Sequence, residues 1–212
     1  MTTTTITAST TGLSTFGGND GSMTLQTGPA GSPVNAITIN SAGQATLLSP
    51  LVAGATITLG TAQATTSGTS ILFTGIPATA KRITVNFKGV GTSGTSLKQI
   101  QVGNGSVVNT GYVSVSMRGA GSAIAVTSNT TTGIVINSNV AADRLAGSIT
   151  LTLENASTNS WIATGSFTEP SSNGGYTTSG SISLSGALDR INITTVNGTD
   201  TFAAGEINVM WE

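Results

Sequence analysis

Two acidic residues near the C-terminal end of the sequence have a spacing that could support glycoside cleavage. Asp200 and Glu206 flank the segment TFAAG, and a turn there would bring their carboxylates together. Glycosidases place two such groups roughly 5 to 10 Å apart. The alternative interpretation has Asp200 bonding its own turn backbone and Glu206 at a solvated strand start. We favour this structural interpretation, because a catalytic carboxylate needs a burial that no pattern here indicates.

Other kinds of reactive site are restricted by composition. The sequence has no cysteine and no histidine, which excludes Cys/His zinc sites and Ser-His-Asp or Cys-His catalysis. The acidic stretches NGTD (197–200) and GGND (17–20) lack the calcium-loop pattern, and GVGTSG (89–94) lacks the Lys-Ser/Thr pair of a phosphate-binding loop. We therefore predict a protein that is not an enzyme and that has no cofactor and no metal site.

Two tyrosines lie among small polar residues, a composition that suits weak and adaptable contact with carbohydrate or protein. Tyr112 ends the segment NGSVVNTGY, and we favour a packed ring there because a strand follows. Tyr176 lies in SSNGGYTTSG (171–180), for which both a receptor-contact loop and a hairpin loop with a packed ring remain open. The candidate receptor-contact residues are Asn173 and Tyr176.

The charge content of the chain is very low. Charged residues make up 7% of the sequence and the net charge is −1, against about 25% charged residues in an average soluble domain. Little electrostatic repulsion keeps copies of such a chain apart, which favours assembly. The seven basic residues are spread along the sequence, so we predict no nucleic-acid binding. We also predict no membrane insertion and no signal peptide, because no apolar run of the needed kind is present.

Two adjacent acid–base pairs are not expected to form salt bridges. Asp143 precedes Arg144, and Asp189 precedes Arg190. Neighbouring residues on a strand point to opposite faces. We expect Asp143 and Arg144 to lie in a loop within residues 140–147.

Short alternating segments separated by turn residues dominate the chain from residue 55 onward. RITVNFKGV places Ile83, Val85 and Phe87 on one face of a strand. Similar segments recur every 8–12 residues or so, which is typical of a β-sandwich or barrel. We predict an all-β fold, an antiparallel β-sandwich of the jelly-roll type over residues 55–212.

The N-terminal part has a different organisation. Residues 1–34 are predicted to form an extended arm, with Ile6, Leu13 and Phe16 as points that dock on a partner. Residues 35–54 are predicted to form a hairpin and a linker, because NAITI and QATLL flank the turn sequence NSAG.

Three segments resemble a β-rich module of tailed-bacteriophage structural proteins of the tail-fibre or virion type. They are ILFTGIPATAKRITVNFKGVGTSGTS (71–96), IQVGNGSVVNTGY (100–112) and LDRINITTVNGTDTFAAGEINVMWE (188–212). The matching pattern includes Phe73, Gly75–Pro77, Arg82–Val90, Gly111–Tyr112 and Asp200–Asn208. NAITINSAGQATL (35–47) also resembles a segment near the N-terminal side of phage fibre domains. These are fold-building positions, and no catalytic set is attached to them.

The resemblance implies a virion component that assembles in the host cytoplasm and works outside the cell. It implies a homotrimeric fibre whose arm attaches to other virion proteins and whose sandwich contacts a host surface glycan or protein. It also implies that INITTVN and EINVMWE form a strand pair that closes the sheet, with Trp211 as its anchor. The alternatives are a capsid decoration protein, a glycan depolymerase and a bacterial surface adhesin.

Overall fold

The structure is a computed structural model, and it divides the chain into two compact units, Met1–Thr56 and Ile57–Glu212. All of the strand pairs that it describes are antiparallel, and no helix occurs among the described residues. The predicted all-β class is therefore confirmed. The described residues are 14–17, 23–27, 34–47, 57–120, 123–128, 130–141, 143–169 and 174–212.

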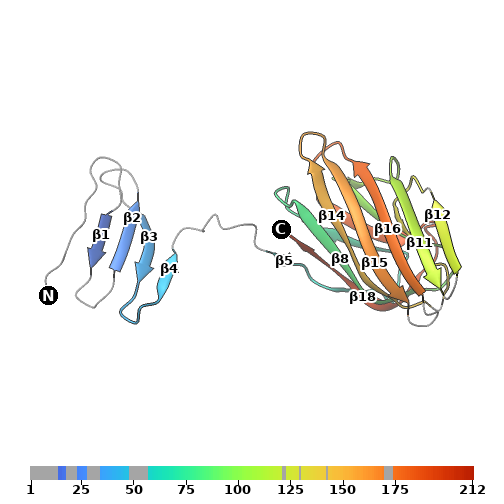
Figure 1. Ribbon diagram of the computed structural model, residues 1–212, viewed down its shortest axis with the longest axis horizontal. Coiled ribbons are helices and arrows are strands. Elements are labelled where there is room, and N and C mark those ends of the chain that lie inside the picture. The colour runs from blue at the N-terminus through green and yellow to red at the C-terminus, as the bar shows by residue number, and fades with distance from the viewer. Residues whose placement is uncertain are drawn as a thin grey trace. The chain divides into compact units, whose positions relative to one another are not determined.

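The first unit contains a four-stranded antiparallel sheet in sequence order (Figure 1). Its strands are β1 (Ser14–Gly17), β2 (Met23–Thr27), β3 (Val34–Ile39) and β4 (Ala45–Leu47). The predicted hairpin is confirmed as β3 and β4. Its turn is held by the Asn40 side chain, whose Oδ1 accepts hydrogen bonds from the backbone N–H groups of Ala42 and Gln44.

The strands β1 and β2 fall within the segment for which the sequence predicted an extended arm. They pair with each other, and β2 pairs with β3. The predicted boundary at residue 34 thus lies inside one sheet, because Met23 to Thr27 satisfy their backbone groups against the hairpin. Ile6 and Leu13 lie outside the described residues. Phe16 lies in β1, where its backbone is opposite Thr24, and its side chain is outside what the structure describes.

The second unit contains a five-stranded and a nine-stranded antiparallel sheet within its described residues. The five-stranded sheet contains β7 (Ser70–Thr74), β9 (Lys98–Asn104), β10 (Ser106–Val107), β13 (Ile134–Ile136) and β17 (Arg190–Thr195). The nine-stranded sheet contains β5 (Thr58–Leu59), β6 (Gln63–Ala64), β8 (Arg82–Thr92), β11 (Val113–Ala120), β12 (Ala123–Ser128), β14 (Leu145–Asn155), β15 (Ser160–Glu169), β16 (Gly174–Ser183) and β18 (Phe202–Trp211). In Figure 1 the strands β8, β14, β15, β16, β11 and β12 run side by side.

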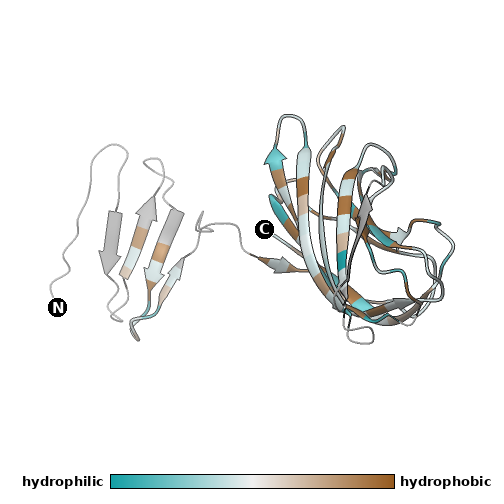
Figure 2. Cartoon of the chain, turned by 45° about the vertical axis from the view of Figure 1, so that its right-hand side comes forward, coloured by the Kyte–Doolittle hydropathy of each residue, from teal (hydrophilic) through white to brown (hydrophobic). Residues whose placement is uncertain are grey.

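The core lies between these two sheets, as in a sandwich. On β8 the predicted face of Ile83, Val85 and Phe87 is buried, while Arg82 and Lys88 are exposed. Apolar residues of the five-stranded sheet, such as Ile100 and Ile193, belong to the same buried cluster. In Figure 2 brown, hydrophobic bands alternate with pale bands of intermediate hydropathy along the strands, the pattern of strands with one buried face.

The expectation that the last two strands pair with each other to close the sheet is wrong. The strand β17 lies between β9 and β7, and β18 lies between β8 and β5, so the two strands belong to different sheets. The polar turn that joins them, around NGTD, therefore crosses from one sheet to the other. Both strands have neighbours on both sides, which confirms that they are central. Trp211 is partly buried and packs against the core.

The pairing of β8 with β18 contains a bulge built from glycines. Its register shifts between Phe202 and Ala204 and again between Ala204 and Glu206. Gly205 has a φ of 92° and Gly89, on the opposite strand, has a φ of 66°, values that L-residues with side chains rarely adopt. A Cβ on Gly205 would lie 2.4 Å from the carbonyl oxygen of Gly89. The close approach of the two backbones therefore requires glycine at position 205.

Candidate functional site

The two carboxylates considered for glycoside cleavage have separate partners. Asp200 accepts hydrogen bonds from the backbone N–H of Ser96 at 2.9 Å and from Asn197 Nδ2 at 2.8 Å. The hydrogen bond from Asn197, followed by that from Ser96, lowers the pKa of the Asp200 carboxyl. Glu206 pairs with Lys88 at 2.8 Å on an exposed strand surface. The structural interpretation needs correction in both details: Asp200 bonds the Asn197 side chain and the distant Ser96 backbone, not its own turn backbone, and Glu206 lies inside β18, not at its start.

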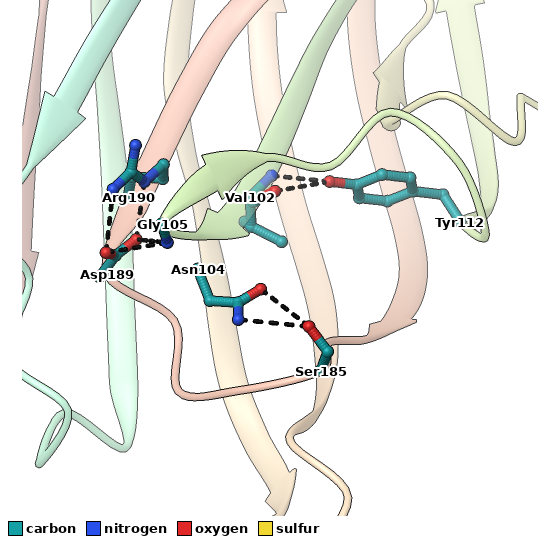
Figure 3. Close-up of polar contacts among 7 residues, drawn as sticks. All are labelled: Val102, Asn104, Gly105, Tyr112, Ser185, Asp189 and Arg190. Atoms are coloured by element: carbon teal, nitrogen blue, oxygen red, sulfur yellow. Dashed lines mark hydrogen bonds and ion pairs between the residues drawn. The ribbon is translucent and has the colours of Figure 1, made fainter.

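The adjacent residues Asp189 and Arg190 do form a salt bridge, contrary to the expectation from strand alternation. Arg190 donates from Nε at 2.7 Å and from a terminal nitrogen at 3.0 Å to the two carboxylate oxygens (Figure 3). Alternation does not apply because Asp189 precedes β17, which begins at Arg190. The Arg190 hydrogen bond lowers the pKa of the Asp189 carboxyl, which also accepts from the Gly105 backbone N–H. The pair thereby ties the β9–β10 turn to β17.

Tyr112 has a packed ring, as predicted, and lies immediately before β11. It is 2% exposed. Its hydroxyl accepts a hydrogen bond from the backbone N–H of Val102 at 2.7 Å and donates to the carbonyl of Val108 at 2.9 Å. Figure 3 shows the hydroxyl directed at the Val102 backbone on β9. Burial raises the pKa of this phenol to about 12. Tyr112 therefore joins the two sheets and is not exposed for contact with a ligand.

A Tyr112→Phe substitution is expected to remove part of the alkaline sensitivity of the fold. The unfolded phenol loses its proton near pH 10, while the folded one keeps it up to a pKa of about 12. The corresponding stabilisation is complete below pH 10 and is lost as the pH rises to 12, which amounts to about 3 kcal/mol. Unfolding free energies measured by denaturant titration between pH 8 and 12 should fall less steeply for the variant. If the unfolding free energy of Tyr112→Phe fell as steeply with pH as that of the unaltered chain, Tyr112 would not be the source of the alkaline sensitivity.

Tyr176 is placed differently from the predicted receptor-contact loop. It lies in strand β16, is 1% exposed, and donates from its hydroxyl to Asp143 Oδ2 at 2.9 Å. From Gly174 onward the chain pairs with β11 and β15, so Tyr176 lies in a paired strand and the loop interpretation of this residue is corrected. Asn173 lies outside the described residues. Burial, followed by the hydrogen bond to Asp143, raises the pKa of Tyr176.

The partner of Tyr176 belongs to a buried polar network. Asp143 and Lys98 are both 0% exposed. Ser138 lies between them, accepting a hydrogen bond from Lys98 Nζ at 3.0 Å and donating to Asp143 Oδ2 at 3.2 Å. As predicted, Asp143 lies in an irregular segment, before β14. Sequence reasoning missed this network because its members come from β9, β16 and a loop, and no local spacing relates them.

The outer face of the nine-stranded sheet has a small recess of about 160 Å³. It lies where β14, β8 and β18 run side by side. In the strand register Thr84 on β8 is opposite both Thr150 on β14 and Met210 on β18. The hydroxyls of Thr84 and Thr150 are 3.3 Å apart. The residues that line the recess are Ile57, Arg82, Thr84, Thr150, Met210, Trp211 and Glu212.

A partly exposed ion pair borders this recess. Arg82 and Glu212 form a salt bridge, and their side chains are 55% and 21% exposed. Hydroxyl, guanidinium and carboxylate groups beside apolar side chains give this recess both hydrogen-bonding groups and apolar contact area for a small ligand. From the sequence, Trp211 was expected only as an anchor of the fold, and Arg82 and Thr84 only as part of a fold-building pattern. The lining residues are brought together by long-range strand pairing, for which no local signal exists.

A second recess of about 410 Å³ lies at an edge of the sandwich, where β5 and β6 face β7. Trp211 also lines this recess, together with Leu59, Leu72 and Phe73. Leu59 and Leu72 are exposed, and the Gln63 amide donates to the Leu72 carbonyl across the opening at 2.8 Å. Trp211 thus lines both recesses, and we take this surface, the Trp211 surface, as the candidate functional site.

Comparisons of the chain with protein-family models, with curated proteins and with solved structures find no match. Among the described residues no helix is long and apolar enough to cross a bilayer. Within the same residues, no group of three or more acidic side chains gathers in a way that could hold a metal ion.

Proposed function

We propose that this chain is a structural component of a bacteriophage particle, a fibre or fibre-like protein. Its N-terminal unit attaches to other virion proteins, and its C-terminal sandwich projects for contact with the host surface. The chain works as a homotrimer, is assembled in the host cytoplasm and is extracellular in the particle. The single observation that carries the proposal is the succession of two separate antiparallel β units in a chain with 7% charged residues.

The physical argument starts from the surface of the second unit. A chain with so few charges has little electrostatic protection against edge-to-edge pairing of its strands. The strand β7 is an edge of the five-stranded sheet, and β12 is an edge of the nine-stranded sheet. The outer face also exposes Val113, Val115 and Met117 on β11. Assembly into a particle covers such surfaces, which favours a virion component over a protein that works alone.

The Trp211 surface supports the host-contact part of the proposal. Its outer recess combines an ion pair, two hydroxyls and apolar side chains in a volume of about 160 Å³. This volume suits one sugar unit of a larger glycan rather than an extended peptide. The recess is built on three paired strands, and sites on regular strands are held more accurately than sites on loops.

The particle location is tested by labelling virus particles with an antibody raised against residues 57–212. A few labels at the tail support the fibre proposal, whereas labels spread over the head mean a decoration protein. Particles without any label overturn a virion role. Mass measurement of the purified native chain tests the homotrimer independently, and a monomer at micromolar concentration contradicts it.

Filling the outer recess is expected to weaken adsorption to host cells. Thr150→Trp places a large side chain on the outer face, while the inward-facing core residues are unchanged. We expect at least about tenfold weaker binding of the purified chain to the propagating bacterium, because one lost anchoring contact costs about 1.4 kcal/mol or more.

The matched control is Thr177→Trp, an exposed position on β16 of the same sheet, away from the recess. This control should bind like the unaltered chain. Equal binding by the Thr150→Trp chain and the unaltered chain would show that the recess is not the contact site.

A further inference from the structure

The buried network around Asp143 contains two groups that a protein interior does not tolerate without compensation. Lys98 is in β9 of the five-stranded sheet, and Asp143 precedes β14 of the nine-stranded sheet. Both side chains are fully buried. Removing an ammonium and a carboxylate from water costs several kcal/mol for each ion in real proteins, so a direct contact of the two charges is expected. Instead, Ser138 Oγ lies between them and is the shared hydrogen-bond partner.

The two oxygens of Asp143 have unequal surroundings. Oδ2 accepts hydrogen bonds from the Tyr176 hydroxyl at 2.9 Å and from the Ser138 hydroxyl at 3.2 Å. Oδ1 is buried and has no hydrogen-bond partner among the described residues. A buried carboxylate oxygen without a partner is rare in folded proteins and requires an explanation. The two donors on Oδ2 draw electron density from the carboxyl carbon, as donors do at a site of acyl transfer.

The amine has the properties of a nucleophile. Burial lowers the pKa of Lys98 to about 8, and the charges that act on it are those of Asp143, Asp200, Glu169 and Arg144. A buried lysine with a lowered pKa is an activated nucleophile near neutral pH. Its four-carbon side chain is flexible, so that rotation about its bonds can move Nζ from the Ser138 hydroxyl to the carboxyl carbon of Asp143.

We propose that Lys98 Nζ and the Asp143 side-chain carboxyl condense to an isopeptide bond within the folded chain. The Nζ–Cγ bond forms and the Cγ–Oδ1 bond breaks. Two protons of the ammonium leave with Oδ1 as water, and the third stays on the amide nitrogen. Oδ2 becomes the amide carbonyl oxygen and keeps its donors Tyr176 and Ser138.

This reaction removes each unfavourable feature of the network. One positive and one negative charge disappear together, so the net charge of the chain does not change. The oxygen without a partner leaves the protein. No oxidant, cofactor or external nucleophile is required, because an ammonium and a carboxylate contain all the atoms of an amide and one water. The bond joins β9 to the segment before β14 and links the two sheets covalently, a property that goes beyond the proposed virion role.

The mass of the intact, folded chain tests the proposal directly. We expect a chain lighter than its sequence mass by one water molecule. Trypsin cannot cleave after a Lys98 that is in amide linkage, so the digest should contain residues 89–118 joined to residues 119–144. Tandem mass spectrometry of this joined peptide places the bond at Lys98 and Asp143.

Two results would overturn the proposal. One is a folded, aged chain at full sequence mass with separate peptides 89–98 and 99–118. The other is a loss of water without the joined peptide, which would mean ring closure at a sequence such as Asp20–Gly21.

Three substitutions complete the test. Lys98→Met removes the amine and should restore the full sequence mass. The matched control Lys88→Met, at an exposed lysine paired with Glu206, should still lose one water. Tyr176→Phe removes one donor to Oδ2 and should slow the appearance of the lighter chain after refolding. If the Lys98→Met chain still lost one water and still contained the joined peptide, the bond could not involve Lys98, and the assignment would be contradicted. If the Lys98→Met chain does not fold, the peptide map of the unaltered chain decides between the two outcomes.

Discussion

A Gly205→Ala substitution is expected to lower the free energy of unfolding of the second unit by about 2–5 kcal/mol, from overpacking and a left-handed backbone together. The added Cβ would lie 2.4 Å from the Gly89 carbonyl oxygen, and the residue has a φ of 92°. The strands β8 and β18 must separate locally to admit the methyl group. Both tryptophans of the chain, Trp161 and Trp211, lie in this unit, so denaturant titration followed by tryptophan fluorescence reports its unfolding.

Gly89→Ala is the matched control on the opposite strand. Gly89 also has a positive φ, of 66°, but a Cβ there would meet nothing within 4 Å. Its substitution should cost only the conformational strain, about 1–2 kcal/mol. The difference between the two variants therefore measures the steric overlap at the bulge. If Gly89→Ala were as destabilising as Gly205→Ala, the close backbone approach would not be the cause.

A Phe87→Ala substitution is expected to destabilise the same unit by about 3–5 kcal/mol, as is usual for a large aromatic residue in a core. The Phe87 ring meets the Phe167 ring edge to face, with centroids 5.3 Å apart. Gly147 lies in β14, between β8 and β15, and in the strand register it is opposite Phe87 on one side and Phe167 on the other. The absence of a side chain at Gly147 lets the two rings meet across an intervening strand. The variant would leave a cavity at this point.

Val113→Ala is a suitable comparison because Val113 is 66% exposed on β11. It should change the unfolding free energy by about 0.5 kcal/mol or less. The same fluorescence-monitored denaturation applies to both variants. A loss below about 1 kcal/mol for Phe87→Ala would mean that the core relaxes into the cavity, and would contradict a rigid contact between the two rings.

The class of the fold could be predicted from the sequence because it depends on local alternation. Ile83, Val85 and Phe87 recur with the period of a strand, and the structure buries all three. The hairpin turn at Asn40 was also local, since NSAG supplies both the Asn side chain and a glycine with positive φ at Gly43. These features follow from a few adjacent residues, and for this reason one sequence is sufficient to predict them.

Pairing between distant strands was not predictable in the same way. The turn after β17 has the composition of a hairpin turn, yet it crosses to the other sheet, because β18 is paired with β8 more than a hundred residues away. Tyr176 was assigned to a loop because glycine, serine and threonine surround it. Those small residues instead let β16 pack between two strands. The outer recess and the Lys98 network depend on such distant pairing, so neither has a sequence signature.

The register of β5 and β18 has a mechanical consequence. Thr58 lies opposite Trp211 in an antiparallel pair, so the point where the chain enters the second unit is adjacent to the Trp211 surface. A pulling force between an anchored N-terminal side and a ligand held at this surface would act across the short β5 ladder. Strands at the other side of the same sheet, such as β11 and β12, would lie outside this load path.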